Sequence, residues 1–174
     1  LDFIKEEPIQ FLGNESLVGE APFVAVNDKG EGLIGNIEVE IGEGEGLILI
    51  NTNPFVEPDT QFSAKTAVDV AGNFTNTDLS DKNVIFNFDI ESDKGLIGGP
   101  SAGASMTVAL ISAINEVKVK EKVVITGSIL PTGEIGVVEG IVEKGQAAID
   151  NGQELFLVPK GQTKFKYYEK KISK

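Results

Sequence analysis

Apolar and polar residues alternate along the first part of this chain, and this alternation constrains its fold more than any other pattern in the sequence. Val39 and Ile41, for example, alternate with Glu38 and Glu40, which predicts a half-buried strand. Strands are predicted before any helix, and helices alternate with strands later in the chain. The predicted strands are 16–26, 33–41, 47–50, 83–90, 123–129 and 155–158, and the predicted helices are 59–73, 101–116 and 140–151.

This order of elements predicts an α+β or mixed α/β fold. A length of 174 residues fits one domain. We expect residues 1–16 to be a lead-in segment, residues 17–160 to form the domain, and residues 161–174 to form a lysine-rich tail or a final helix. Because the chain begins at Leu1 rather than at methionine, we expect it to be part of a longer protein, and its cellular location is left open.

The apolar runs of the chain are short. The strand at 47–50 is predicted to be buried, and the helix at 59–73 is predicted to carry Phe62, Ala67 and Val70 among its apolar positions.

No apolar run approaches the roughly 18 residues that a membrane-spanning helix needs. The chain itself is therefore not expected to span a membrane.

Composition argues against several classes of partner. The formal net charge is −12 and all 15 basic residues are lysine, so we expect no binding to nucleic acid or to an anionic membrane. The acidic residues show no metal-loop spacing, and no G-x-x-x-x-G-K-[ST] phosphate loop occurs. We therefore predict neither a cofactor nor a metal site in this chain.

The chain contains no histidine and no cysteine, which limits its nucleophilic chemistry. Neither a Ser-His-Asp triad nor a cysteine thiolate can be built, so a nucleophile would be a hydroxyl and its base a lysine or a carboxylate. Ser101 and Lys144 are the best pair that the sequence offers.

Ser101 follows Gly98, Gly99 and Pro100 at the start of a predicted helix. Glycines allow the backbone to approach a substrate closely, and the free amides at the start of a helix suit an oxyanion. A serine at this position is therefore placed to attack a carbonyl carbon. The alternative is that Ser101 only caps the helix.

Lys144 lies on the predicted helix 140–151, away from the polar side chains that gather on another side of it. Its place between Ala147 and Ala148 on the helical wheel predicts that it is partly buried among small residues. A lysine base near pH 7 needs a pKa roughly three units below its usual 10.4, which burial can provide. The alternative is that the lysine extends its amine to solvent. The expected apolar face consists of Ile141, Val142, Gly145, Ala148 and Ile149.

Three blocks of sequence together resemble a known family. They are Gly99-Pro100-Ser101-Ala102-Gly103, Thr126-Gly127 and Gly140-x-x-Glu143-Lys144, with 25 residues from the serine to the threonine and 43 from the serine to the lysine. In this order and spacing they resemble the proteolytic domain of Lon-type serine proteases over about residues 95–160. The resemblance implies a single Lon-protease-like domain with small sheets and packed helices.

The resemblance also implies a role for each matching residue. Ser101 would be the nucleophile and Lys144 the general base, with Thr126 hydrogen-bonded to the lysine. The backbone amides of Gly99 and Ser101 would be candidates for the oxyanion hole, with Pro100 between them as a supporting residue.

Two features depart from the family. Gly98 stands where the family often has an acidic residue, and no phosphate loop occurs, so an ATPase part would lie outside this chain. A membrane-anchor segment of the parent protein is likewise expected only outside it. The resemblance implies a serine endopeptidase that acts on a protein or peptide and assembles into a ring of identical copies. Two alternatives stay open, a small amidase or esterase and a catalytically silent binding or assembly domain with the same fold.

Overall fold

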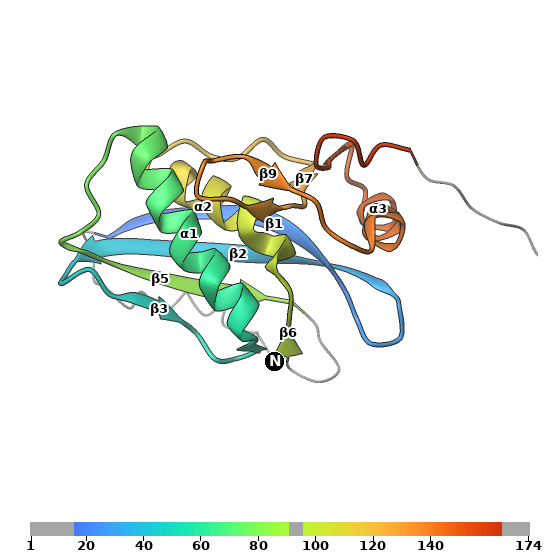
Figure 1. Cartoon of the computed structure of the whole chain (residues 1–174), viewed down its shortest axis with the longest axis horizontal. Coiled ribbons are helices and arrows are strands. Elements are labelled where there is room, and N and C mark those ends of the chain that lie inside the picture. Colours follow the sequence, from blue (N-terminus) through green and yellow to red (C-terminus); the bar gives the residue numbers. More distant parts are fainter. Residues whose placement is uncertain (1–15, 91–95, 165–174) are drawn as a thin grey trace, which may run out of the picture.

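The computed structural model describes residues 16–90 and 96–164. Its largest element is a four-stranded sheet with the order β1-β2-β5-β3 (Figure 1). Strands β1 (Leu17–Val26), β2 (Gly32–Glu43) and β5 (Lys82–Asp89) pair in antiparallel fashion, and the short β3 (Ile48–Ile50) runs parallel to β5. The predicted combination of strands and helices is confirmed.

Two long helices lie together over the sheet (Figure 1). Helix α1 (Pro58–Thr75) packs against α2 (Gly103–Asn115), and α2 in turn packs on β1 and β2. The core fills the space between them, and the inward-facing side chains of β2 and β5 are almost fully buried there. Phe23 and Phe88 meet edge to face across the sheet, with ring centroids 5.7 Å apart.

Three pairs of short strands complete the fold, as expected for small sheets with packed helices. Helix α3 connects two strands that pair in parallel. The pairs are β4 (Phe55–Val56) with β6 (Leu96–Ile97), β8 (Ser128–Ile129) with β9 (Ile135–Gly136), and β7 (Val123–Ile125) with β10 (Leu155–Leu157), and α3 is Ile141–Asp150.

The strand predicted at 123–129 is interrupted at Thr126 and Gly127. At this break the backbone leaves the β7 ladder and forms hydrogen bonds with the residues around the start of α2. The amide of Gly127 donates to the carbonyl oxygen of Ser101 at 3.1 Å, and the amide of Ala104 donates to the carbonyl oxygen of Gly127 at 3.0 Å. The interruption therefore ties β7 and β8 to the segment that carries Ser101.

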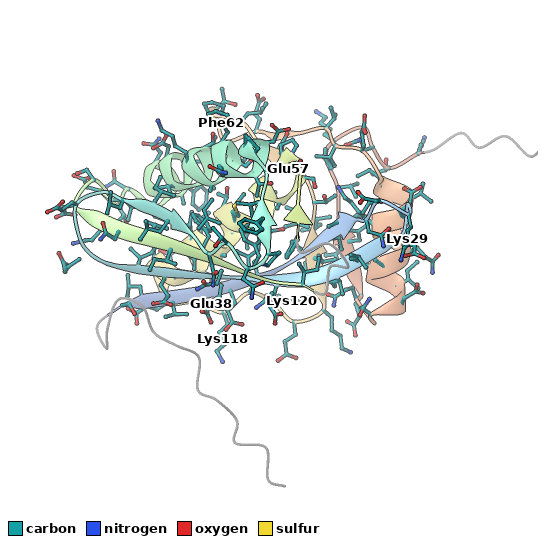
Figure 2. The ribbon with its side chains drawn as sticks, turned by 90° about the horizontal axis from the view of Figure 1, so that it is seen from below. Lys29, Glu38, Glu57, Phe62, Lys118 and Lys120 are labelled. Carbon is teal, nitrogen blue, oxygen red and sulfur yellow. The ribbon has the colours of Figure 1, made fainter. Side chains whose placement is uncertain are left out.

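The burial predicted for the strand at 47–50 is wrong for two of its residues. Leu47 and Leu49 of the segment predicted as a buried strand are exposed, because side chains alternate along β3 and only Ile48 and Ile50 face the core. Of the apolar positions expected on the helix at 59–73, Phe62 is 72% exposed on the outer side of α1 (Figure 2), whereas Ala67 and Val70 are buried. A helix buries only the stripe that faces its neighbours, and Phe62 lies outside that stripe.

The two ends of the chain contribute little to this description. The predicted lead-in at 1–16 and the predicted tail at 161–174 fall almost entirely outside the described residues. Within residues 16–90 and 96–164, no helix is both long enough and apolar enough to cross a membrane.

Helix α2 crosses β1 in backbone contact at Gly19. A β-carbon on Gly19 would overlap the carbonyl oxygen of Ala109 and the amide nitrogen of Ala113. Both alanines are fully buried. The close approach of α2 to the sheet therefore requires a residue without a side chain at position 19.

We expect Gly19→Ala to lower the free energy of unfolding by about 1–3 kcal/mol, because rigid backbone atoms must move. Gly145→Ala is the matched control, since its β-carbon would lie 3.5 Å from the ring of Phe156. Alanine inside helix α3 should be neutral or stabilising by up to about 1 kcal/mol. Urea unfolding of both variants measures the difference, and an unchanged midpoint for Gly19→Ala would contradict the close contact.

Candidate active site

Ser101 lies in a short 3-10 turn, η1 (Pro100–Ala102), between β6 and α2. The residue that caps η1 is Gly99 and the residue that caps α2 is Ala102, and neither cap has a side-chain hydrogen bond. Ser101 is therefore not the cap of α2, and the capping alternative is wrong. Its half-buried side chain lines a cleft instead.

Hydroxyl groups of α1 hold the backbone just before Ser101. The fully buried Thr60 donates its hydroxyl to the carbonyl oxygen of Gly99 at 3.1 Å, and Ser63 donates to that of Pro100 at 3.5 Å. Gly99 has φ 80, a backbone conformation that favours glycine. Because the amides of Gly99 and Ser101 lie at the start of the turn, they are among those without an intrahelical partner.

Thr126 forms a hydrogen bond with the backbone of Ser101. Its side chain is fully buried, and its hydroxyl donates to the carbonyl oxygen of Ser101 at 3.4 Å. Among the described residues, the hydrogen bonds of Thr126 include none to Lys144, although the family resemblance implied one. In this structure Thr126 positions the serine backbone rather than the lysine.

Helix α3 buries Lys144 against the β1–β2 hairpin. The side chain is only 4% exposed and shares the buried face of α3 with Ile141, Ala147 and Ala148. The predicted apolar face is thus wrong for Val142 and Ile149, which are exposed. The predicted burial of Lys144 is confirmed, and the alternative of an amine extended to solvent is wrong.

A glycine in β2 allows this burial. A β-carbon on Gly32 would overlap the backbone carbonyl of Glu143, so α3 touches the strand directly. The next turn of α3 continues the contact, because Ala148 packs in a cluster with Val24 and Val124. Small residues on both sides therefore bring Lys144 close to the sheet.

Burial changes the proton affinity of Lys144. Loss of solvation lowers the pKa of the amine from 10.5 to about 8, while the nearby carboxylates of Glu139 and Glu143 oppose this decrease. Close to neutral pH a useful fraction of this lysine is thus free of its proton. That is the property that a lysine base requires.

Ser101 and Lys144 line the same cleft, whose volume is about 690 Å³. Gly99 and Pro100 line it beside the serine, and Glu139 lies on the segment before α3. Among the described residues no hydrogen bond joins the Ser101 hydroxyl to the Lys144 amine. Ser101 and Lys144 therefore line one cleft, whereas the buried Thr126 does not line it.

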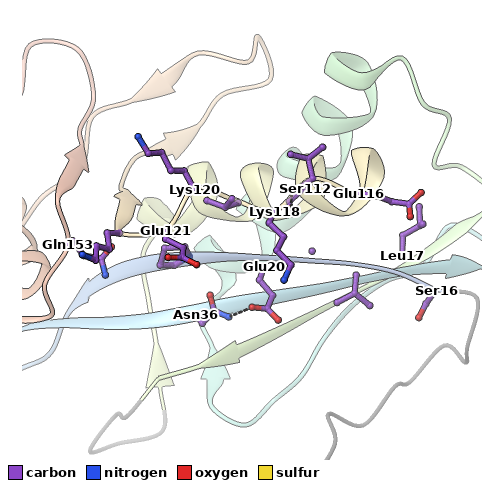
Figure 3. Close-up of a pocket in the computed structure, with 16 residues that line it drawn as sticks. Ser16, Leu17, Glu20, Asn36, Ser112, Glu116, Lys118, Lys120, Glu121 and Gln153 are labelled. Atoms are coloured by element: carbon purple, nitrogen blue, oxygen red, sulfur yellow. Dashed lines mark hydrogen bonds between the residues drawn. The ribbon is translucent and has the colours of Figure 1, made fainter.

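A second pocket of about 570 Å³ lies at the other end of β1 (Figure 3). Leu17 and Glu20 line it from the strand, and Lys118 and Lys120 line it from the loop after α2. None of the predicted site residues lines this pocket, so it carries no part of the predicted chemistry. Among the described residues no cluster of acidic, histidine or cysteine side chains is suited to hold a metal ion.

Sequence reasoning missed three residues around the cleft. Thr60 and Ser63 lie one turn apart on the buried face of α1, and hydroxyls on such a face are a signal for a buried hydrogen bond. Glu139 was not singled out, because its approach to Lys144 depends on how the segment before α3 folds back.

The lowered pKa of Lys144 predicts a pH-dependent cost in stability. The unfolded chain keeps the lysine proton up to about 10.5, whereas the folded chain loses it near 8. The cost is therefore present in full below pH 8, decreases between pH 8 and 10.5, and is absent above that range. The shift corresponds to about 3 kcal/mol.

We expect Lys144→Met to raise the free energy of unfolding by up to about 3 kcal/mol at pH 7, because methionine fills the space without a charge. The gain should disappear as the pH rises to 10.5. Lys65→Met, on the exposed side of α1, is the control and should show no such window. Denaturant unfolding from pH 6 to 11 tests this, and a pH-independent difference would argue against a shifted pKa.

Comparison with known proteins shows the family of the chain. Residues 14–168 match the model of the Lon protease (S16) C-terminal proteolytic domain. The chain is 30% identical over 178 residues to Lon protease 1 of Myxococcus xanthus. The aligned region covers 94% of this chain and 21% of that protein. It is 41% identical over 66 residues to the Lon protease of Clostridium acetobutylicum, covering 38% of this chain and 8% of the relative.

An archaeal relative shows the same likeness. The archaeal Lon protease of Archaeoglobus fulgidus is 36% identical over 87 residues, which are 50% of this chain and 14% of that protein. The chain thus spans about a fifth or less of the length of these curated relatives. Since the family model covers nearly the whole chain, the chain belongs to the family of Lon protease (S16) C-terminal proteolytic domains.

Proposed function

We propose that this chain is a serine endopeptidase domain in which Ser101 is the nucleophile and Lys144 the general base. The observation that carries the proposal is the buried amine of Lys144, with its pKa lowered to about 8, in the same cleft as Ser101. Membership in a family of proteolytic domains supports peptide bonds as the substrate.

The proposed reaction has two halves. The neutral Lys144 amine accepts the hydroxyl proton of Ser101 as the serine oxygen attacks the carbonyl carbon of the peptide. The resulting ammonium gives this proton to the leaving amine, and an acyl-enzyme forms. A water molecule then attacks the ester while Lys144 accepts its proton, and the proton returns to Ser101 as the acid product leaves.

The η1 turn supplies the proposed oxyanion hole. The amides of Gly99 and Ser101 are candidates to donate to the negative oxygen of the tetrahedral intermediate. Their orientation is supported by Thr60, which holds the carbonyl of Gly99, and by Thr126 and Gly127, which hold the carbonyl of Ser101. No cofactor or metal ion takes part in these steps.

Two alternatives are less well supported. A small amidase or esterase would use the same groups, but the family model describes a proteolytic domain. A silent binding domain would gain nothing from a desolvated lysine, which costs stability and is typical of functional sites. Ring assembly, and an ATPase or membrane anchor elsewhere in the protein, stay predictions from the family resemblance.

We expect Ser101→Ala and Lys144→Ala each to abolish cleavage of an unstructured, casein-like protein, because each removes one half of the dyad. The fold should be retained in both. Ser80→Ala and Lys65→Ala, at exposed positions outside the cleft, are the matched controls. Mass spectrometry of the products measures cleavage, and labelling of Ser101 by a serine-reactive phosphonate provides a second readout.

Retained cleavage by Lys144→Ala would contradict the dyad, whatever its stability. Hydrolysis of small esters without cleavage of the unstructured protein would favour the esterase instead. Absence of both cleavage and labelling in the wild-type protein would favour the silent domain.

The pH dependence of cleavage follows from the same lysine. We expect kcat/KM to rise with pH through an apparent pKa of about 8, because only neutral Lys144 accepts a proton. The chain has no histidine to produce a rise near pH 6.5. Rates on a peptide substrate from pH 5 to 10 measure the profile, with the fold checked at each point. A flat profile, or an optimum near pH 4–5, would indicate a carboxylate base.

A further inference from the structure

The charged side chains that line the Ser101 cleft are few. Within the described part of the chain they are Glu139, Glu143 and Lys144. Both glutamates are exposed, and both act on the amine of Lys144 through their charge. When Lys144 is neutral, as the proposed reaction requires, the described lining retains two negative charges and no positive one.

We propose that Glu139 and Glu143 make the cleft select peptide segments with a lysine or arginine side chain beside the bond to be cleaved, and reject segments with acidic side chains there. This inference depends on the proposed function, because it assigns the substrate class of the same cleft.

The walls of the cleft fit such a side chain. Val26, Val137 and Val138 provide apolar surface next to the two carboxylates. Lysine and arginine combine an aliphatic stem with a charged end, so the stem contacts the valines while the end meets the glutamates. An acidic side chain in the same place would face two like charges.

A basic side chain in the cleft would also act on the reaction. In the free protein the two glutamates raise the pKa of Lys144 against the effect of burial. A substrate cation that pairs with them cancels this influence, so Lys144 loses its proton at a lower pH in the complex. For basic peptides the pH limb of kcat should therefore lie below that of kcat/KM.

Other described charged groups also lie close to the cleft. The carboxylate of Glu57 lies against the lining residue Gly98, because a β-carbon there would overlap it, so this further carboxylate has the same sign as the two glutamates. The turn between β1 and β2 carries Asp28, Lys29 and Glu31 around the lining residue Gly30. Their side chains do not line the cleft, and they include both signs of charge. The faces of β1 and β2 that contact α3 present mainly apolar residues and glycine.

Binding to the inactive Ser101→Ala variant tests the selection without relying on catalysis. Three labelled peptides of one sequence carry lysine, glutamine or glutamate at the central positions. We expect the lysine peptide to bind roughly tenfold more tightly than the glutamate peptide, with the glutamine peptide between them, and the preference to weaken in high salt.

Variants assign the preference to the two glutamates. In the Ser101→Ala background, Glu139→Gln with Glu143→Gln should abolish it, and Glu139→Lys should reverse it. Glu121→Gln, at an exposed position of the other pocket, removes the same charge outside the cleft and should keep it. Equal binding of the three peptides, or a preference that persists without both glutamates, would overturn the inference.

Turnover by the wild-type protein separates this inference from the proposed function. Cleavage of all three peptides at equal rates, with equal binding, would overturn the charge selection and leave the endopeptidase. Selective binding without cleavage of any peptide would support the charge selection and count against the endopeptidase.

Discussion

Helix α3 packs so closely on the β1–β2 hairpin that the side chain of Lys144 loses most of its contact with water. Gly32 permits this contact, since any side chain there would meet the backbone of α3. Desolvation then lowers the pKa of the amine to about 8. The chemistry of the cleft, its pH dependence and its stability cost all depend on this one packing arrangement.

The serine depends on a different set of contacts. Thr60 and Ser63 reach the η1 turn from α1, and Gly127 and Thr126 reach it from the interrupted strand. These bonds use backbone carbonyls and leave the first amides of the turn available to a substrate. Two parts of the fold, far apart in sequence, thus fix the backbone around Ser101, while α3 brings Lys144 to the same cleft.

The sequence predicted most of the elements and the burial of Lys144, because both depend on local patterns. Strand alternation placed β1, β2 and β5, and the small residues around Lys144 indicated its burial. The strand at 123–129 was predicted as continuous. Its interruption depends on the hydrogen bond from Gly127 to Ser101, and Ser101 is distant in the sequence. Val142 was wrongly placed on the apolar face of α3, since the local sequence does not indicate which residue at the edge of a helix face is covered. The approach of Glu139 to Lys144 also depends on tertiary packing, so the local sequence does not indicate it.

Titration of the Lys144 amine in the folded protein tests the central claim most directly. Lysine side chains labelled with carbon-13 at Cε report each amine by nuclear magnetic resonance, and loss of one signal in Lys144→Met assigns it. The account predicts a pKa of about 8 for this amine, well below the ordinary 10.5 of lysine. A value near the ordinary 10.5 would contradict the account, because Lys144 would then be an ammonium at neutral pH and unable to accept the proton of Ser101.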